Sequence, residues 1–351
     1  MSQVHTDFRW SFLGCSQRGA SHVRQNLPNQ DAIEHWPPDG GSPSIILAVA
    51  DGHGSAKSFR SNLGARFAVE TAIAICREFL ERMKGAEPSA VKTDAELRIP
   101  RRIFQEWKRR VEDHHRQNPF TDAELDHLAE QAGPAVRERA TRPEQLATAY
   151  GSTLLAVVLA DEFLISFQLG DGDVLAVSDA TGVAERVIPK DESLIANETT
   201  SLCQGEDGLR YVRYRFQLLR DSAPAMLLLS TDGYVNSFAS PDAFLKVGAD
   251  YLDMLCKDGS KEIAKNLPHW LEDTSSNGSG DDITVGIVYR CQPPLSKPGD
   301  RQPETESPIA SASVEKASTT KATSNVSEKL PEKETHPSER SAEGTEDHKL
   351  T

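Results

Sequence analysis

The chain has 351 residues, of which 38% are hydrophobic and 6% aromatic, a length that suits one large domain with additional segments. Its formal net charge is −14, and this acidic balance argues against nucleic acid as the main partner, because phosphate backbones require a basic surface. The five cysteines are scattered without a CxxC pair, which argues against a zinc cluster and a disulfide framework.

The first residues lack the pattern of a signal peptide, and no apolar run approaches the length that spans a bilayer. Together with the unpaired cysteines, which favour a reducing compartment, this predicts a cytoplasmic protein with no membrane partner.

Short apolar runs predict the strands, and they lie at 45–50, 153–160, 163–169, 174–178, 211–218, 226–230 and 283–289. Several are joined by short turns, as in VVLADEFLISF, which favours antiparallel hairpins over parallel crossovers. Phe59, Leu63 and Phe67 recur every four residues and predict a helix that runs to about Arg82, and residues 240–272 predict two more. Strand groups with segregated helices predict an α+β layered domain.

Two segments differ from this pattern. Residues 84–146 are polar and strongly charged, and stretches such as RRIFQEWKRRVEDHHRQ predict a helical insertion between two parts of the core. Residues 292–351 contain no aromatic residue, so they cannot bury enough apolar area to offset the entropy of ordering. We therefore expect a folded domain at 1–291, insertion included, and a disordered low-complexity tail at 292–351.

Aspartates recur where apolar runs begin or end, mostly beside glycine: Asp31 in PNQDA, Asp51 in IILAVADG, Asp171 in LGDGD, Asp232 in LLLSTDG, and Asp281 and Asp282 in GDDITVGIV. A turn is the simplest interpretation of any single Asp-Gly pair, and it suits Asp173. As a set, converging carboxylates repel one another unless cations hold them together. Oxygen donors without His or Cys select Mg²⁺ or Mn²⁺, and two such ions can activate a bridging water.

The motifs VADGHG, GSTLLAVVL, LGDGDVLA, LLLSTDGYVNSF and GDDITVGIV, in this order, resemble the metal-dependent Ser/Thr protein phosphatases of the 2C type, the PPM family. NQDA resembles a bacterial branch of that family. The resemblance covers about residues 10–290 without the insertion. It implies an αββα sandwich of two mostly antiparallel sheets flanked by helices. It also implies a signalling enzyme that hydrolyses phosphoserine and phosphothreonine with a metal-activated water.

The resemblance implies a role for each matching residue. It implies two Mn²⁺ or Mg²⁺ ions and a weaker third ion. Asp51, the Gly52 carbonyl, Asp232 and Asp281 would bind the first two ions, and Asp31 would act through a bound water. Asp171 would bind the third ion. His53 matches the position of a general acid for the leaving oxygen, and the alternative is a loop histidine without a catalytic role.

The sequence departs from the family pattern at three places. Gln30 replaces a Glu and predicts weaker binding of the second ion, and Asn236 replaces an Asp of the third site. Asn26 replaces the phosphate-binding Arg. Arg24 is our candidate for that role, with Arg18 nearby in the chain, and the alternative is a surface arginine.

Three functions are compatible with these residues. The first is an active phosphatase acting on a phosphorylated protein, with a Ser/Thr kinase or its targets as partners. The second is a weak or inactive pseudophosphatase that binds phosphoproteins, which the departures favour and the retained carboxylates disfavour. The third is a hydrolase of a small phosphorylated molecule.

Overall fold

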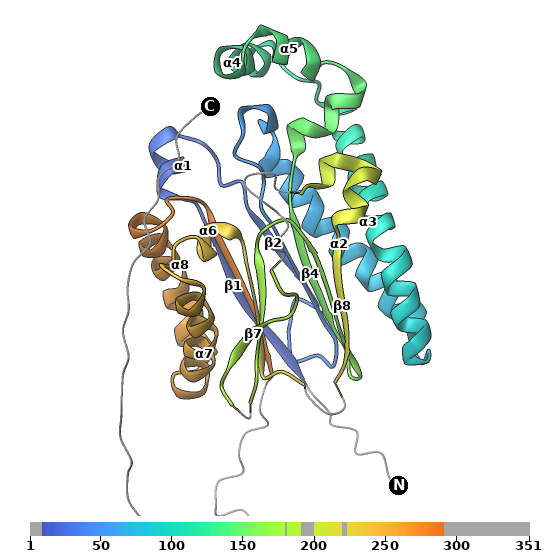
Figure 1. The fold of residues 1–351 in the computed structure, drawn as a ribbon, viewed down its shortest axis with the longest axis vertical. Helices are drawn as coiled ribbons and strands as arrows, with labels where there is room; N and C mark the ends of the chain where they lie inside the picture. The colour runs from blue at the N-terminus through green and yellow to red at the C-terminus, as the bar shows by residue number, and fades with distance from the viewer. Residues whose placement is uncertain (1–8, 180, 191–199, 220–222, 291–351) are drawn as a thin grey trace, which may run out of the picture. The chain divides into compact units, whose positions relative to one another are not determined.

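A computed structural model of the chain describes residues 9–179, 181–190, 200–219 and 223–290, and the predicted tail at 292–351 lies outside them. The described strands form two five-stranded sheets, ordered β1-β10-β9-β6-β7 and β2-β3-β4-β5-β8 (Figure 1). Every neighbouring pair is antiparallel, which confirms the expected α+β class. The strands are β1 (Trp10–Gln17), β2 (Ala32–Trp36), β3 (Ile45–Ala50), β4 (Leu154–Leu159), β5 (Phe163–Leu169), β6 (Asp173–Val177), β7 (Ala184–Arg186), β8 (Arg213–Leu218), β9 (Met226–Ser230) and β10 (Ile283–Arg290).

Strand β3 shows why the predicted runs have no polar face. All six side chains of IILAVA are buried. The odd-numbered ones lie in the core between the two sheets, and the even-numbered ones join the core beneath helix α2 (Ser61–Met83). A strand covered on both faces reads as a continuous apolar run, because successive side chains point to opposite sides.

Helices cover the outer face of each sheet, which completes the expected αββα layers (Figure 1). Helix α2 packs on the second sheet and α3 (Pro88–Gln117) packs on α2. The two helices expected within 240–272 are α7 (Pro241–Lys257) and α8 (Ser260–Asn277), and both contact the first sheet. The remaining helical elements are α1 (Ala20–Gln25), α4 (Asp122–Ala132), α5 (Pro134–Ala140), α6 (Asp232–Val235), and the short helices η1 (Ala56–Ser58), η2 (Pro143–Tyr150) and η3 (Leu202–Tyr211). None of the helices in the described part of the chain is long and apolar enough to cross a membrane.

Helix α3 lies within the segment expected as an insertion, yet it belongs to the core. Its stripe of Val91, Ala95, Ile99, Ile103 and Trp107 is buried in the same cluster as α2. The composition of the segment did not reveal this buried stripe, because most other side chains of α3 are charged or polar. Beyond α3, helices α4 and α5 lie at one end of the fold (Figure 1).

Three strands, β1, β2 and β7, were not predicted, and each is an edge strand of its sheet. An edge strand is paired on one side only, so it tolerates partly exposed and polar positions that break an apolar run. The run predicted at 211–218 begins as a strand only at Arg213, because Tyr211 closes η3.

Arg60, directly before α2, connects that helix to the end of α3, to α4 and to η2. Its side chain is 9% exposed and contacts both carboxylate oxygens of Glu124 at 2.6 and 2.8 Å. It also donates to the Asn118 carbonyl at 2.7 Å and to the Tyr150 hydroxyl at 2.9 Å. These contacts anchor the end of the loop that follows β3.

The Arg60–Glu124 pair predicts a pH-dependent contribution to stability. Hydrogen bonding from Arg60 lowers the pKa of Glu124 to about 2, against about 4.3 in an unfolded chain. The ionised carboxylate therefore contributes stability above about pH 4.3, which is lost as the pH falls towards 2. We expect Glu124→Gln to lower the free energy of unfolding at pH 7 by about 2 kcal/mol, measured by urea unfolding.

The control is Glu130→Gln, at a carboxylate that is 75% exposed, and we expect it to change stability little. The loss in Glu124→Gln should shrink at about pH 3.5. An equal loss at both pH values would contradict the ionic origin of the effect.

Candidate metal centre

Asp51 follows β3 directly, and its backbone is paired with the next strand. Its amide donates to Thr153 Oγ1 at 2.9 Å, and the Thr153 amide donates to the Asp51 carbonyl at 2.8 Å. A Cβ at Gly52 would lie only 2.6 Å from the Gln30 carbonyl oxygen and 2.7 Å from that of Ser61. Glycine is therefore required at position 52, because three backbone segments meet there.

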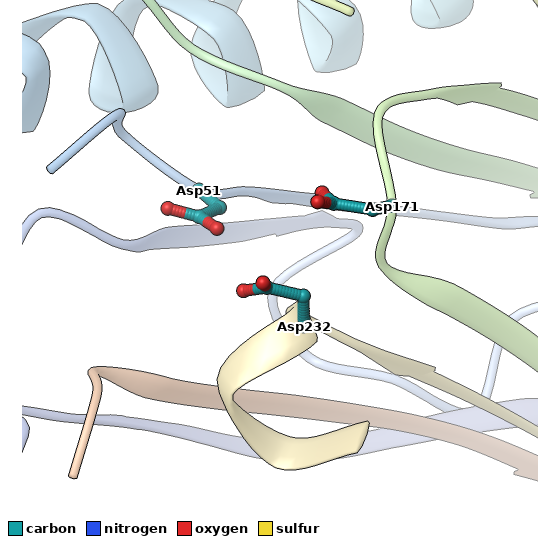
Figure 2. A group of neighbouring side chains, drawn as sticks. All are labelled: Asp51, Asp171 and Asp232. Carbon is teal, nitrogen blue, oxygen red and sulfur yellow. The ribbon is translucent and has the colours of Figure 1, made fainter. Parts of the chain in front are cut away.

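Two further carboxylates approach Asp51 from other parts of the chain. Asp171 lies in the turn between β5 and β6, and Asp232 begins α6 directly after β9. Carboxylate oxygens of Asp51, Asp171 and Asp232 all lie within 4.8 Å of one another, and Figure 2 shows them facing a common space. Since β3 and β5 belong to one sheet and β9 to the other, the group forms where the ends of the two sheets meet.

Asn236 lies beside this group. Its Nδ2 donates to Asp232 Oδ2 at 3.0 Å. Where the family pattern has a second carboxylate for a third ion, this chain thus has an amide that orients Asp232.

Burial and mutual repulsion make these carboxylates costly to ionise without a cation. Burial, together with the charges of Asp31 and Asp232, raises the pKa of Asp51 well above its ordinary value. Burial and the charge of Asp171 raise the pKa of Asp232 to about 6. Divalent cations would remove this penalty, and the oxygen donors suit Mg²⁺ or Mn²⁺.

A cavity of about 200 Å³ opens at this group, lined among others by Asp51, Asp171, Asp232 and Asp281. Gln30 also lines it, and its side-chain oxygen is buried without a hydrogen-bond partner. An orphaned buried acceptor at a cation site fits the presence of an ion or of a water bound to one.

Asp31 lies beside the group rather than on the cavity wall. Its Oδ2 accepts from Thr231 Oγ1 at 2.8 Å, and the same hydroxyl accepts from the Thr284 amide at 2.9 Å. Burial, and then the charge of Asp282, raises the pKa of Asp31 well above its ordinary value. Its expected action through a bound water stays a prediction.

Asp282 has a structural role that the sequence did not indicate. Its side chain is buried and accepts from the backbone amides of Gly19 and Gln30, each at 2.6 Å. His22 Nδ1 lies 2.8 Å from the same carboxylate, and His22 itself lines the cavity. No local pattern marks His22, because only the chain path brings α1 to the start of β10.

His53 lines the cavity from the loop after Asp51. Its amide donates to the Gly151 carbonyl at 3.1 Å, and its Nε2 is buried without a hydrogen-bond partner. Burial lowers the pKa of the imidazole, and the charge of Asp171 partly opposes this.

The two arginines considered for phosphate binding lie elsewhere. Arg24 is exposed on α1, and Arg18 donates to the His22 carbonyl at 2.9 Å. Among the described residues, no arginine or lysine lines the cavity. The role expected for Arg24 stays a prediction.

Asp173 was expected in a turn, and that interpretation was wrong. It begins β6, is only 1% exposed, and binds Arg186 through both carboxylate oxygens at 2.9 and 3.1 Å. Its carboxylate is thus neutralised within the first sheet.

A two-sheet sandwich with an acidic, oxygen-donor cavity at the sheet ends is a scaffold for metal-assisted chemistry on an anionic substrate. The sequence model of the protein phosphatase 2C family matches residues 18–272. The chain therefore belongs to the protein phosphatase 2C family, whose members are metal-dependent Ser/Thr phosphatases.

Solved structures of bacterial phosphatases are similar to this one at low sequence identity. A serine/threonine phosphatase of S. agalactiae is 16% identical with a TM-score of 0.49, over 80% of this chain and 99% of that chain. The catalytic domain of PstP, in complex with two manganese ions, is 16% identical with a TM-score of 0.46, over 81% and 100%. PppA, a regulatory component of T6SS in Pseudomonas aeruginosa, is 17% identical with a TM-score of 0.44, over 80% and 98%. No curated protein matches the sequence significantly.

The repulsion within the acidic group predicts opposite effects of one substitution with and without ions. Without divalent cations, we expect Asp51→Asn to melt about 2–4 °C above the unchanged chain, because one of the clustered charges is removed. Mn²⁺ should raise the melting temperature of the unchanged chain and have little effect on the variant. Differential scanning calorimetry in EDTA and in Mn²⁺ measures both.

The control is Asp207→Asn, at a carboxylate that is 85% exposed and is not among the residues that line the cavity. It should follow the unchanged chain in both buffers. A variant of Asp51 that Mn²⁺ stabilises as strongly as the unchanged chain would show that the ion binds elsewhere.

Proposed function

We propose that this chain is an active metal-dependent phosphatase that hydrolyses phosphoserine and phosphothreonine in proteins. The observation that carries the proposal is the convergence of Asp51, Asp171 and Asp232 on a cavity that His53 also lines. A phosphate group fits in such a cavity only beside cations, since the wall is acidic.

Each part of the cavity has a task in this proposal. Asp51 and Asp232 hold the ions, and Asn236 keeps Asp232 in place. When bound, divalent ions supply an activated water and neutralise the phosphoryl oxygens. His53 holds a proton at Nε2 and donates it to the departing serine or threonine oxygen.

A phosphoprotein-binding module without turnover is the second candidate. The lack of an arginine or lysine among the described wall residues favours it, as do Gln30 and Asn236 in place of carboxylates. The retained acidic group favours the enzyme, because buried repelling carboxylates are costly unless they serve an ion. The kinase partner and the cytoplasmic location stay predictions from the sequence.

The decisive measurement is phosphate release from a phosphothreonine peptide in Mn²⁺, in Mg²⁺ and in EDTA. We expect release with a divalent ion, none in EDTA, and loss to background in Asp232→Ala. The melting curve of Asp232→Ala checks that the variant is folded. No release with either ion from the folded, unchanged chain would favour the binding module.

The role of His53 predicts a dependence on the leaving group. We expect His53→Gln to slow kcat on a phosphothreonine peptide by about 10²- to 10⁴-fold, because the alkoxide leaves without a proton. Turnover of p-nitrophenyl phosphate should change little, since a phenolate needs no proton to leave. Asp232→Ala is the matched control and should lose activity on both substrates. Equal slowing of both by His53→Gln would show that His53 is not the proton donor.

A further inference from the structure

A second cavity, of about 70 Å³, opens between α4, α5 and the short helices η1 and η2. Four apolar side chains line it: Leu128, Val136, Ala140 and Ala149. Two exposed cations, Lys57 and Arg139, line it as well, and no carboxylate of a described residue does. Figure 1 shows α4 and α5 at the same end of the fold as α6, the helix that Asp232 begins.

The charges of Lys57 and Arg139 are not neutralised within the described part of the chain. Their neighbours Arg137 and Arg142 each form an ion pair with a carboxylate, at 3.3 and 3.2 Å. Arg139 instead donates to a carbonyl of its own helix at 3.2 Å, and the Lys57 ammonium has no described partner. In a chain of net charge −14, two unpaired cations around one apolar cavity are complementary to an acidic ligand.

The loop after β3 connects this second cavity to the metal centre. Gly54 and Ser55 line the metal cavity, and Lys57, two residues later, lines the second one. On the opposite wall, η2 runs directly into Gly151, whose carbonyl accepts from the His53 amide at 3.1 Å. Since two residues span at most about 7 Å of extended chain, the two cavities are neighbours.

We propose that the second cavity binds an acidic side chain of the phosphoprotein substrate. The inference rests on the proposed function and names its substrate class: phosphoserine or phosphothreonine with a glutamate or aspartate about two to four positions away. An extended peptide covers about 7–13 Å over that span, which suits cavities whose walls are two residues apart. The described wall of the metal cavity has no arginine or lysine, so Lys57 and Arg139 would supply the side-chain cations for substrate binding.

The test compares phosphothreonine peptides that carry glutamate, glutamine or lysine two to four positions before or after the phosphothreonine. With the full chain in Mn²⁺, we expect glutamate on one side to lower KM by about 3- to 10-fold relative to glutamine, since each exposed charge pair contributes little. The value of kcat should stay the same, because the contact is equal in the bound substrate and in the transition state. High salt should reduce the preference.

The double variant Lys57→Gln with Arg139→Gln should abolish the preference for glutamate. The matched control is Lys246→Gln with Lys265→Gln, which removes the same charge from cations that are 76% and 73% exposed on α7 and α8. It should keep the preference. Melting curves check that both double variants are folded.

The outcomes separate this inference from the proposed function. Turnover that is indifferent to glutamate on either side overturns the inference and leaves the phosphatase intact. A preference that the Lys57 and Arg139 double variant retains overturns the assignment to this cavity. No preference in the unchanged chain, with faster turnover of every peptide by that double variant, assigns the cavity to an acidic segment of this chain instead.

Absence of turnover with every peptide contradicts the phosphatase, and binding then tests the cavity by itself. The same peptides, labelled with a fluorophore, report their affinity for the unchanged chain by fluorescence anisotropy. Tighter binding of the glutamate peptide, lost in the double variant, supports the inference, and equal binding of all peptides overturns it.

Discussion

The repulsion among carboxylates gathered at the ends of both sheets constrains the rest of this structure. Asp51, Asp171 and Asp232 come from distant parts of the chain, yet their oxygens lie within 4.8 Å of one another. Burial raises the pKa of Asp51 and Asp232, so ionising them together is unfavourable without a cation. The fold therefore holds these groups against their own electrostatics.

Backbone contacts between the sheets keep the acidic group in place. The Asp282 carboxylate, directly before β10, accepts hydrogen bonds from the backbone amides of Gly19 and Gln30. It therefore connects the first sheet to the segment that enters β2. Gly52 permits Gln30, Ser61 and the end of β3 to meet. The Arg60 contacts anchor the end of the loop that carries His53. Each of these carboxylates is positioned by packed elements of the fold.

The cavity combines this acidic set with two histidines and, in the described part of the wall, no arginine or lysine. A phosphate in this cavity would therefore depend on bound ions more than on side-chain cations. In the proposed function, His53 would protonate the leaving group from the wall of this cavity.

Much of the fold could be predicted from sequence, because strands buried on both faces, such as β3 and β9, read as unbroken apolar runs. The aspartates that follow them could also be found, since a strand end fixes where a carboxylate lies. The edge strands β1, β2 and β7 were not predicted, because half-exposed positions interrupt their apolar patterns. Asp173 was mistaken for a turn residue because its partner Arg186 comes from another strand. His22 and Asp282 meet across more than two hundred residues, and only the tertiary structure brings them together, because local patterns carry no information about which distant segments become neighbours.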